Sequence, residues 1–195
     1  MDTITNRKKQ ALETKRKIYD IAVKLFAEYG FDKVSIQQIC KECEISVGGF
    51  YHHYKTKTDI LDEGYRLFDK QTQEYFENNH PSSPIRTIYF LIEKQTDSVT
   101  ELGYKAFSQY LNNQLYLDGK FILHNDRYFP KKIKECVELA VENELLCGDA
   151  STIAEELLST SRGLIYDWCL HNGTYSIKER ALSLTKMILS FYQNK

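Results

Sequence analysis

The apolar side chains of this sequence recur at helical spacing, and this feature restricts its fold more than any other. In the first segment they fall at positions i, i+3, i+4, i+7, i+8 and i+11, on one face of an α-helix. These residues are Ile18, Ile21, Ala22, Leu25, Phe26 and Tyr29. Gly30 predicts the helix end, because glycine adopts the left-handed conformation there without a Cβ penalty. Only 3 Pro and 9 Gly occur in 195 residues, so long helices are favoured over a many-stranded β fold.

Two short helices and a longer one are predicted next. Ser35 and Ser46 are each placed to cap a short helix, because a serine hydroxyl accepts a hydrogen bond from a free backbone N–H. The first short helix should end near Glu44, and a longer helix should open at Thr58 or Asp59. The candidates to point inward from the second short helix are Phe50, Tyr51 and Tyr54. This outline is typical of a helix-turn-helix unit, whose second helix can enter the major groove of DNA.

The remaining sequence predicts a larger helical body. The Pro-containing stretch 78–84 separates the fourth helix from a fifth that begins near residue 84. Further helices are expected over 101–117, 128–146, 151–170 and 176–193, with a turn at Asp118–Gly119. Leu115 and Leu145 are expected on inward faces, and residues 121–123 are either a helix end or a short extended piece.

The last two predicted helices, joined by a short loop, must lie antiparallel. Small residues at Ser159, Ser161 and Gly163 would allow another helix to approach closely. The pattern alone leaves two interpretations open, an internal hairpin packed on its own body or a dimer surface in which two hairpins form a four-helix bundle.

Charge is distributed unevenly along the chain. Residues 1–57 contain 11 Lys and Arg against 7 Asp and Glu, whereas residues 58–195 contain 15 against 20. A basic N-terminal part suggests that this part meets a polyanion. Six of its basic residues form a lead-in to the helix-turn-helix unit, for which we expect non-specific attraction to phosphates. They are Arg7, Lys8, Lys9, Lys15, Arg16 and Lys17.

The five cysteines are widely scattered, and the first residues lack the apolar segment of a secretory signal. We therefore expect reduced thiols and a cytoplasmic location. No apolar run approaches the roughly 18 residues of a membrane span, so no membrane partner is expected. Cys40 and Cys43 have the spacing of a redox or zinc half-site, but no βαβ pattern surrounds them and the adjacent His52 and His53 lack zinc-finger spacing.

Four blocks of sequence carry a family resemblance. They read IAVKLFAEYGF at 21–31, SIQQIC at 35–40, ISVGGFYHHYKTK at 45–57 and DIL at 59–61. The segment resembles the tetracycline-repressor (TetR) family of bacterial transcription regulators. The resemblance implies an all-α fold with a three-helix DNA-binding head, residues 1–56, and a helical ligand-binding and dimerisation body, residues 57–195.

The resemblance also implies a function and partners. It implies a homodimeric repressor of transcription, paired through the helices at 151–170 and 176–193 and bound to a palindromic operator in double-stranded DNA. A small organic effector would release it, and no enzyme activity, cofactor or metal is expected. Two alternatives are a dimeric DNA-binding regulator without an effector, and a redox or zinc protein based on Cys40 and Cys43.

The candidate DNA-binding residues belong to the two short helices and the start of the fourth. They are Ser35, Gln37, Gln38, Ser46, Val47, Gly48, Gly49, Tyr51, His52 and Lys57. Tyr51 and Lys57 resemble the family's phosphate contacts. Gly48 and Gly49 have no side chains, so they either form a loose turn or let the backbone approach DNA closely. The family usually has Gly where this chain has Glu44, at a left-handed position that costs a residue with a Cβ roughly 1–2 kcal/mol.

Aromatic residues make up 13% of the chain, and several of them are candidates to line a cavity for a small, flat, apolar molecule. The candidates are Tyr65, Phe68, Tyr89, Tyr104, Phe107, Tyr110, Phe121, His124 and Trp168. For each of them, ordinary packing between helices is the competing interpretation.

Overall fold

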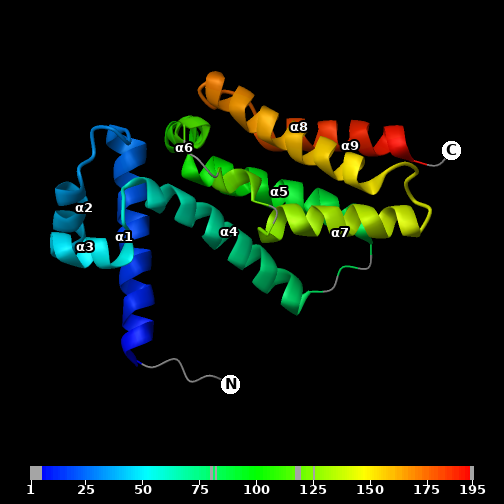
Figure 1. Cartoon of the computed structure of the whole chain (residues 1–195). Helices are drawn as coiled ribbons and strands as arrows, with labels where there is room; N and C mark the ends of the chain where they lie inside the picture. The colour runs from blue at the N-terminus through cyan, green and yellow to red at the C-terminus, as the bar shows by residue number, and fades with distance from the viewer. Residues whose placement is uncertain (1–5, 80, 82, 117–119, 125, 194–195) are drawn as a thin grey trace.

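The computed structural model describes residues 6–79, 81, 83–116, 120–124 and 126–193. Its helices are α1 (Asn6–Tyr29), α2 (Ile36–Cys43), α3 (Val47–His53), α4 (Thr58–Asn78), α5 (Pro84–Leu102), α6 (Tyr104–Tyr116), the 3-10 helix η1 (Phe121–Leu123), α7 (Tyr128–Glu142), α8 (Ala150–Leu170) and α9 (Ile177–Tyr192). Over these ranges the only β pairing is an isolated bridge between Leu146 and Gln193, so the predicted all-α fold is confirmed. Figure 1 shows a small head of α1–α3 beside a larger layered body, with α4 running from one to the other.

The head forms where the sequence predicts it. The Oγ atoms of Ser35 and Ser46 cap α2 and α3, accepting hydrogen bonds from the backbone N–H of Gln38 at 3.1 Å and of Gly49 at 3.0 Å. Gly30 ends α1 in a left-handed conformation, with φ +87°. The core that holds the three helices together includes the fully buried side chains of Ile18, Phe26, Ile39 and Phe50.

Helix α4 is tied to the head by polar contacts near its start. The Lys57 Nζ donates hydrogen bonds to the backbone carbonyls of Phe31 at 2.5 Å and Val34 at 2.8 Å, in the segment between α1 and α2. One turn into α4, the Glu63 carboxylate pairs with the Lys15 Nζ of α1 at 2.7 Å. These contacts fix the head on the first turns of α4.

The body is a layered helical bundle around α5. Helix α5 packs against α4, α6, α7 and α9, and α8 packs against α6, α7 and α9. Its core includes the fully buried side chains of Ile88, Leu91, Ile133 and Ile153. The side chains of Asp149 and Ser176 cap α8 and α9. Within the described ranges, no helix combines the length and apolar character needed to cross a bilayer.

A buried ion pair joins α4 to α7. The guanidinium of Arg127 donates to both carboxylate oxygens of Asp69, at 2.8 and 3.1 Å, and the backbone N–H of Phe129 donates to the same carboxylate at 3.1 Å. Because both ionised side chains are buried, removal of either would leave an uncompensated charge. The pair therefore fixes the register of α7 on α4.

The start of the helix predicted at residue 101 is wrong, and the structure defines two features that the sequence left open. Helix α1 begins at Asn6, so the basic lead-in is helical from Arg7 onward. Helix α5 continues to Leu102 and α6 begins at Tyr104, because Gly103, with φ +81°, breaks the chain between them. Residues 121–123 form a 3-10 helix, and the turn predicted at 118–119 lies outside the described residues.

Two leucines predicted to face inward are exposed. Leu115 is 63% exposed because Gln114 takes the buried position of that turn, donating to the Asp62 carboxylate at 3.1 Å. Helix α7 ends at Glu142 rather than 146, and the left-handed Glu144 reverses the chain. The reversal leaves Leu145 44% exposed and buries Leu146 in its place.

Candidate DNA-binding surface and ligand pocket

The outer face of α3 is open to solvent. Phe50 anchors the helix in the head core, and Tyr51 packs edge-on against its ring, with centroids 5.5 Å apart. Of the three aromatic residues predicted to point inward, Phe50 and Tyr54 are buried, but Tyr51 is 52% exposed. Val47 is 39% exposed, and Gly48 and His52 are also exposed. Figure 1 places α2 and α3 on the side of the head away from the body. The helix therefore presents four of its seven residues outward on a rigid support.

The start of α2 adds polar groups to the same unit. Ser35 and Gln37 are exposed and Gln38 is half-buried. The oxygens of Ser35 and Ser46 accept the capping hydrogen bonds, so each hydroxyl hydrogen stays available to donate to another acceptor. A helix N-terminus with such a hydroxyl suits a phosphate oxygen.

Lys57 also has a structural role, in binding backbone carbonyls, that the sequence did not predict. Its two hydrogen bonds to backbone carbonyls use two of the three ammonium hydrogens, and its Nζ also lies 4.2 Å from the centroid of the Phe31 ring. Burial lowers the pKa of this ammonium, and the nearby Asp32 opposes that effect. One N–H therefore remains for a phosphate, from a side chain whose position the head already fixes.

The histidines of α3 differ in their surroundings. His52 is exposed, whereas His53 is half-buried at the inner side of the helix. Burial, followed by the nearby His52 and Lys15, lowers the pKa of His53. The imidazole of His53 is therefore predominantly uncharged near neutral pH, and its role is packing.

The paired cysteines of α2 belong to the core of the head. Cys40 and Cys43 are both buried, and burial raises the pKa of the Cys43 thiol to about 11. Thiols in such surroundings are protonated and unreactive. Within the described part of the chain, no cluster of three or more His, Cys, Asp or Glu side chains is arranged to hold a metal ion. Both cysteines therefore act as small apolar side chains.

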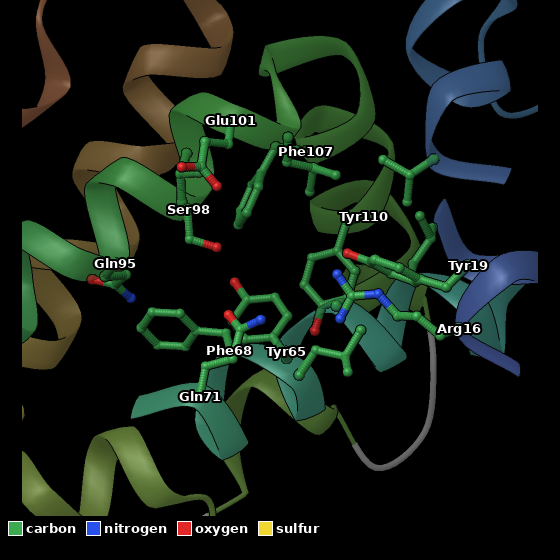
Figure 2. A pocket seen from close by; sticks show the side chains of 16 residues that line it. Arg16, Tyr19, Tyr65, Phe68, Gln71, Gln95, Ser98, Glu101, Phe107 and Tyr110 are labelled. Atoms are coloured by element: carbon green, nitrogen blue, oxygen red, sulfur yellow. The ribbon is translucent and has the colours of Figure 1, made fainter. Parts of the chain in front are cut away.

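The body contains a cavity of about 230 Å³ between α1, α4, α5 and α6. Four of the predicted aromatics, Tyr65, Phe68, Phe107 and Tyr110, line it (Figure 2). The sequence did not identify its other lining residues, which include Arg16, Tyr19 and Val23 from α1 and Gln71, Gln95, Ser98 and Glu101 from α4 and α5. A polar residue on an otherwise apolar helix face is the sequence signal that could have indicated them. Which of these polar residues face a cavity is decided by tertiary contacts, which the sequence does not show.

The other predicted aromatics lie elsewhere. Trp168 borders a neighbouring, more open hollow, and Phe121 borders a groove between α4 and α7. Tyr89, Tyr104 and His124 lie outside these three cavities.

The final hairpin leaves an apolar surface uncovered within the protomer. On α8, Tyr166 and Leu170 are 49% and 63% exposed, and a Cβ added to Gly163 would meet nothing within 4 Å. On α9, Met187 and Phe191 are 65% and 79% exposed. Ser161, expected among the small residues of this surface, is instead buried and donates to the Gln95 side chain.

Comparison with known proteins finds sequence similarity to bacterial transcriptional regulators. Residues 18–63 match the family model described as bacterial regulatory proteins, tetR family. The HTH-type transcriptional regulator AcrR of Shigella flexneri is 22% identical over 95% of this chain and 92% of its own length. The regulator UidR of Escherichia coli K12 is 30% identical over 53% of this chain. The matched part spans half of the length of UidR.

A solved structure agrees in fold. Thermus thermophilus FadR, a TetR family transcriptional repressor in complex with lauroyl-CoA, superposes with a TM-score of 0.65 at 17% identity, over 90% of this chain and 93% of its own.

Glu44 occupies a left-handed position in the turn between α2 and α3, with φ +56° and ψ +42°. Its side chain is 87% exposed, and the nearest cation, the Lys17 Nζ, lies 3.9 Å away. We expect Glu44→Gly to relieve the backbone strain and to stabilise the head by about 1 kcal/mol. The midpoint of thermal unfolding should rise by about 2–4 °C.

Glu44→Gln is the matched control, because it removes the charge and keeps the Cβ. Its midpoint should stay within about 1 °C of wild type, since exposed ion pairs contribute little. Equal midpoints for the two variants would contradict the strain at this position.

Proposed function

We propose that this chain, which belongs to the tetR family of bacterial regulatory proteins, is a cytoplasmic homodimeric repressor that an organic effector releases from a palindromic operator. The family assignment makes it a DNA-binding transcriptional regulator and not an enzyme. The exposed outer face of α3, held on the buried Phe50, is the observation that carries the proposal. A short helix held this way is suited to insertion into a major groove.

The candidate residues divide into two kinds of contact. Tyr51 would donate its hydroxyl to a phosphate, joined by Ser35 at the start of α2 and the remaining N–H of Lys57. Val47 and the bare backbone at Gly48 would face base edges, where an apolar group recognises a thymine methyl. The proposed surface also includes Gln37, Gln38, Ser46, Gly49 and His52. The proposed DNA-binding domain comprises residues 1–56.

Tyr51→Phe tests the phosphate contact. Loss of one hydrogen bond to a charged phosphate should weaken binding about tenfold per protomer. The slope of log K against log salt should stay unchanged, because the substitution removes no positive charge. Fluorescence anisotropy on a duplex enriched from random DNA by the wild-type protein measures both quantities.

Tyr75→Phe is the control for this variant, because Tyr75 lies on α4 in the body and is 41% exposed. It should bind DNA like wild type. Equal affinities for Tyr51→Phe and wild type would remove Tyr51 from the DNA-binding surface.

A homodimer is proposed because the hairpin exposes large apolar side chains. Tyr166, Leu170, Met187 and Phe191 are each about half-exposed or more in the protomer, and the open space at Gly163 allows a second helix to approach. Burial of an apolar side chain of this size contributes roughly 1.5–3 kcal/mol. Two such hairpins would pack as a four-helix bundle and hold two heads at a fixed separation.

Met187→Glu combined with Phe191→Glu should abolish dimerisation, because the new carboxylates would be buried without partners. Sedimentation velocity should report the 22.9 kDa monomer in place of a species of twice that mass. Operator affinity should fall about 100-fold or more, because the second head no longer binds at high effective concentration.

Leu139→Glu, at a 49% exposed site on α7, is the matched control and should remain dimeric. A wild-type protein that sediments as a monomer at micromolar concentration would contradict the proposed assembly.

An effector is proposed because the 230 Å³ cavity borders both sides of the joint between head and body. Its walls include Tyr19 from the head and Tyr65 from α4. FadR of Thermus thermophilus, whose fold is similar, was solved in complex with lauroyl-CoA, so a protein of this fold can bind an organic ligand. A ligand would release DNA only if it binds the spread arrangement of the heads better than the DNA-ready one.

A further inference from the structure

We propose that the cavity between α1, α4, α5 and α6 takes a compact, uncharged ring compound that carries a hydrogen-bond acceptor. This inference rests on the proposed effector function and names the chemistry of the ligand. It follows from three properties of the lining residues: two phenol hydroxyls without partners, aromatic walls and an interior without charge.

The first property is a pair of buried hydroxyl groups. The hydroxyls of Tyr65 and Tyr110 are buried and have no hydrogen-bond partner among the described residues. The two side chains are only 9% and 2% exposed. An unsatisfied buried polar group costs roughly 1–3 kcal/mol, so a ligand that accepts a hydrogen bond here recovers free energy that the empty site lacks. Figure 2 shows the Tyr65 hydroxyl directed into the pocket, toward the side of Ser98.

These hydroxyls act as donors. Burial raises the pKa of Tyr65 and of Tyr110, so both phenols stay protonated at neutral pH. Gln95 adds a further donor at the edge of the pocket. Its side-chain oxygen accepts from Ser161 of α8, which leaves the amide N–H groups for the pocket. The buried part of the lining therefore offers phenol O–H groups and an amide N–H as hydrogen-bond donors to a ligand.

The second property is the shape and apolar character of the walls. The rings of Tyr65 and Tyr110 lie 4.7 Å apart between centroids, and Phe107 lies about 6 Å from each. Phe68 and several aliphatic side chains, among them Leu61 and Val99, add to the apolar lining. A volume of about 230 Å³ suits a molecule of one or two rings rather than a long chain.

The third property is the position of charge. Of the described residues that line the cavity, only Arg16 and Glu101 are charged, and both are exposed. Arg16 also pairs with Asp20 at 3.0 Å. The guanidinium of Arg127 lies 4.3 Å from the Tyr65 ring centroid, but both Asp69 oxygens already bind it. A charged ligand would thus lose its hydration in the buried part of the cavity and meet an opposite charge only at exposed side chains, where an ion pair contributes little.

Four probes with one naphthalene skeleton separate these properties. They are 2-acetylnaphthalene, with a neutral acceptor; 2-isopropylnaphthalene, of the same shape without an acceptor; 2-naphthoate, an anion; and naphthalen-2-ylmethylammonium, a cation. Calorimetric titration of the full-length protein should give the tightest binding for the acetyl compound. The isopropyl compound should bind about tenfold more weakly, and the two ions about 100-fold more weakly or not at all.

Tyr65→Phe identifies the donor. It should reduce the tenfold preference for acetyl over isopropyl to about twofold or less, with the affinity for the isopropyl compound retained. The free variant should be at least as stable as wild type, because it removes an unsatisfied buried hydroxyl. Tyr89→Phe, a half-buried tyrosine of α5 outside the cavity, should keep the wild-type preference.

Three results would overturn the proposal: an ion that binds as tightly as the acetyl compound, no binding of any probe at millimolar concentration, or an unchanged preference in Tyr65→Phe. Operator affinity, measured separately with and without the acetyl compound, tests the proposed function. Selective binding without a change in operator affinity would refute the effector role and leave the ligand chemistry standing.

Discussion

Helix α4 packs into the head at its start and into the body at its other end, through one continuous hydrophobic core, and the geometry of the described chain depends on this constraint. Near its start Ile60 is fully buried, and near its other end Phe76 is buried in the body. Polar contacts reinforce the head end, where Lys57 binds the carbonyls between α1 and α2 and Glu63 pairs with Lys15. A change in the tilt of α4 therefore moves the head with respect to the body.

The cavity lies at this joint. Gly64 of α4 faces Tyr19 of α1 so closely that an added Cβ would lie 2.9 Å from the Tyr19 hydroxyl oxygen, and both residues line the cavity. The absent side chain lets α1 approach α4 beside the proposed ligand. A molecule in the cavity would touch head and body together, which is the physical condition for differential binding to two arrangements of the heads.

Local signals in the sequence predicted much of the head. The serine caps and the glycine stop at Gly30 depend on residues a few positions apart, and they are present in the structure. The left-handed position of Glu44, which the family resemblance implied, is also present. Features that tertiary contacts decide were not predicted. Leu115 fits the helical period, yet Gln114 is buried because Asp62, distant in the sequence, accepts its hydrogen bond. The polar lining of the cavity and the carbonyl contacts of Lys57 were missed for the same reason.

In the proposed dimer, the paired hairpins would hold two copies of α3 at a spacing that matches duplex DNA. Selection of duplexes from random-sequence DNA by the wild-type protein, followed by sequencing, tests this spacing. The proposed dimer should enrich an inverted repeat whose half-sites are centred about one helical turn apart, roughly 34–36 Å. Enrichment of a single asymmetric half-site, or no enrichment at all, would contradict it.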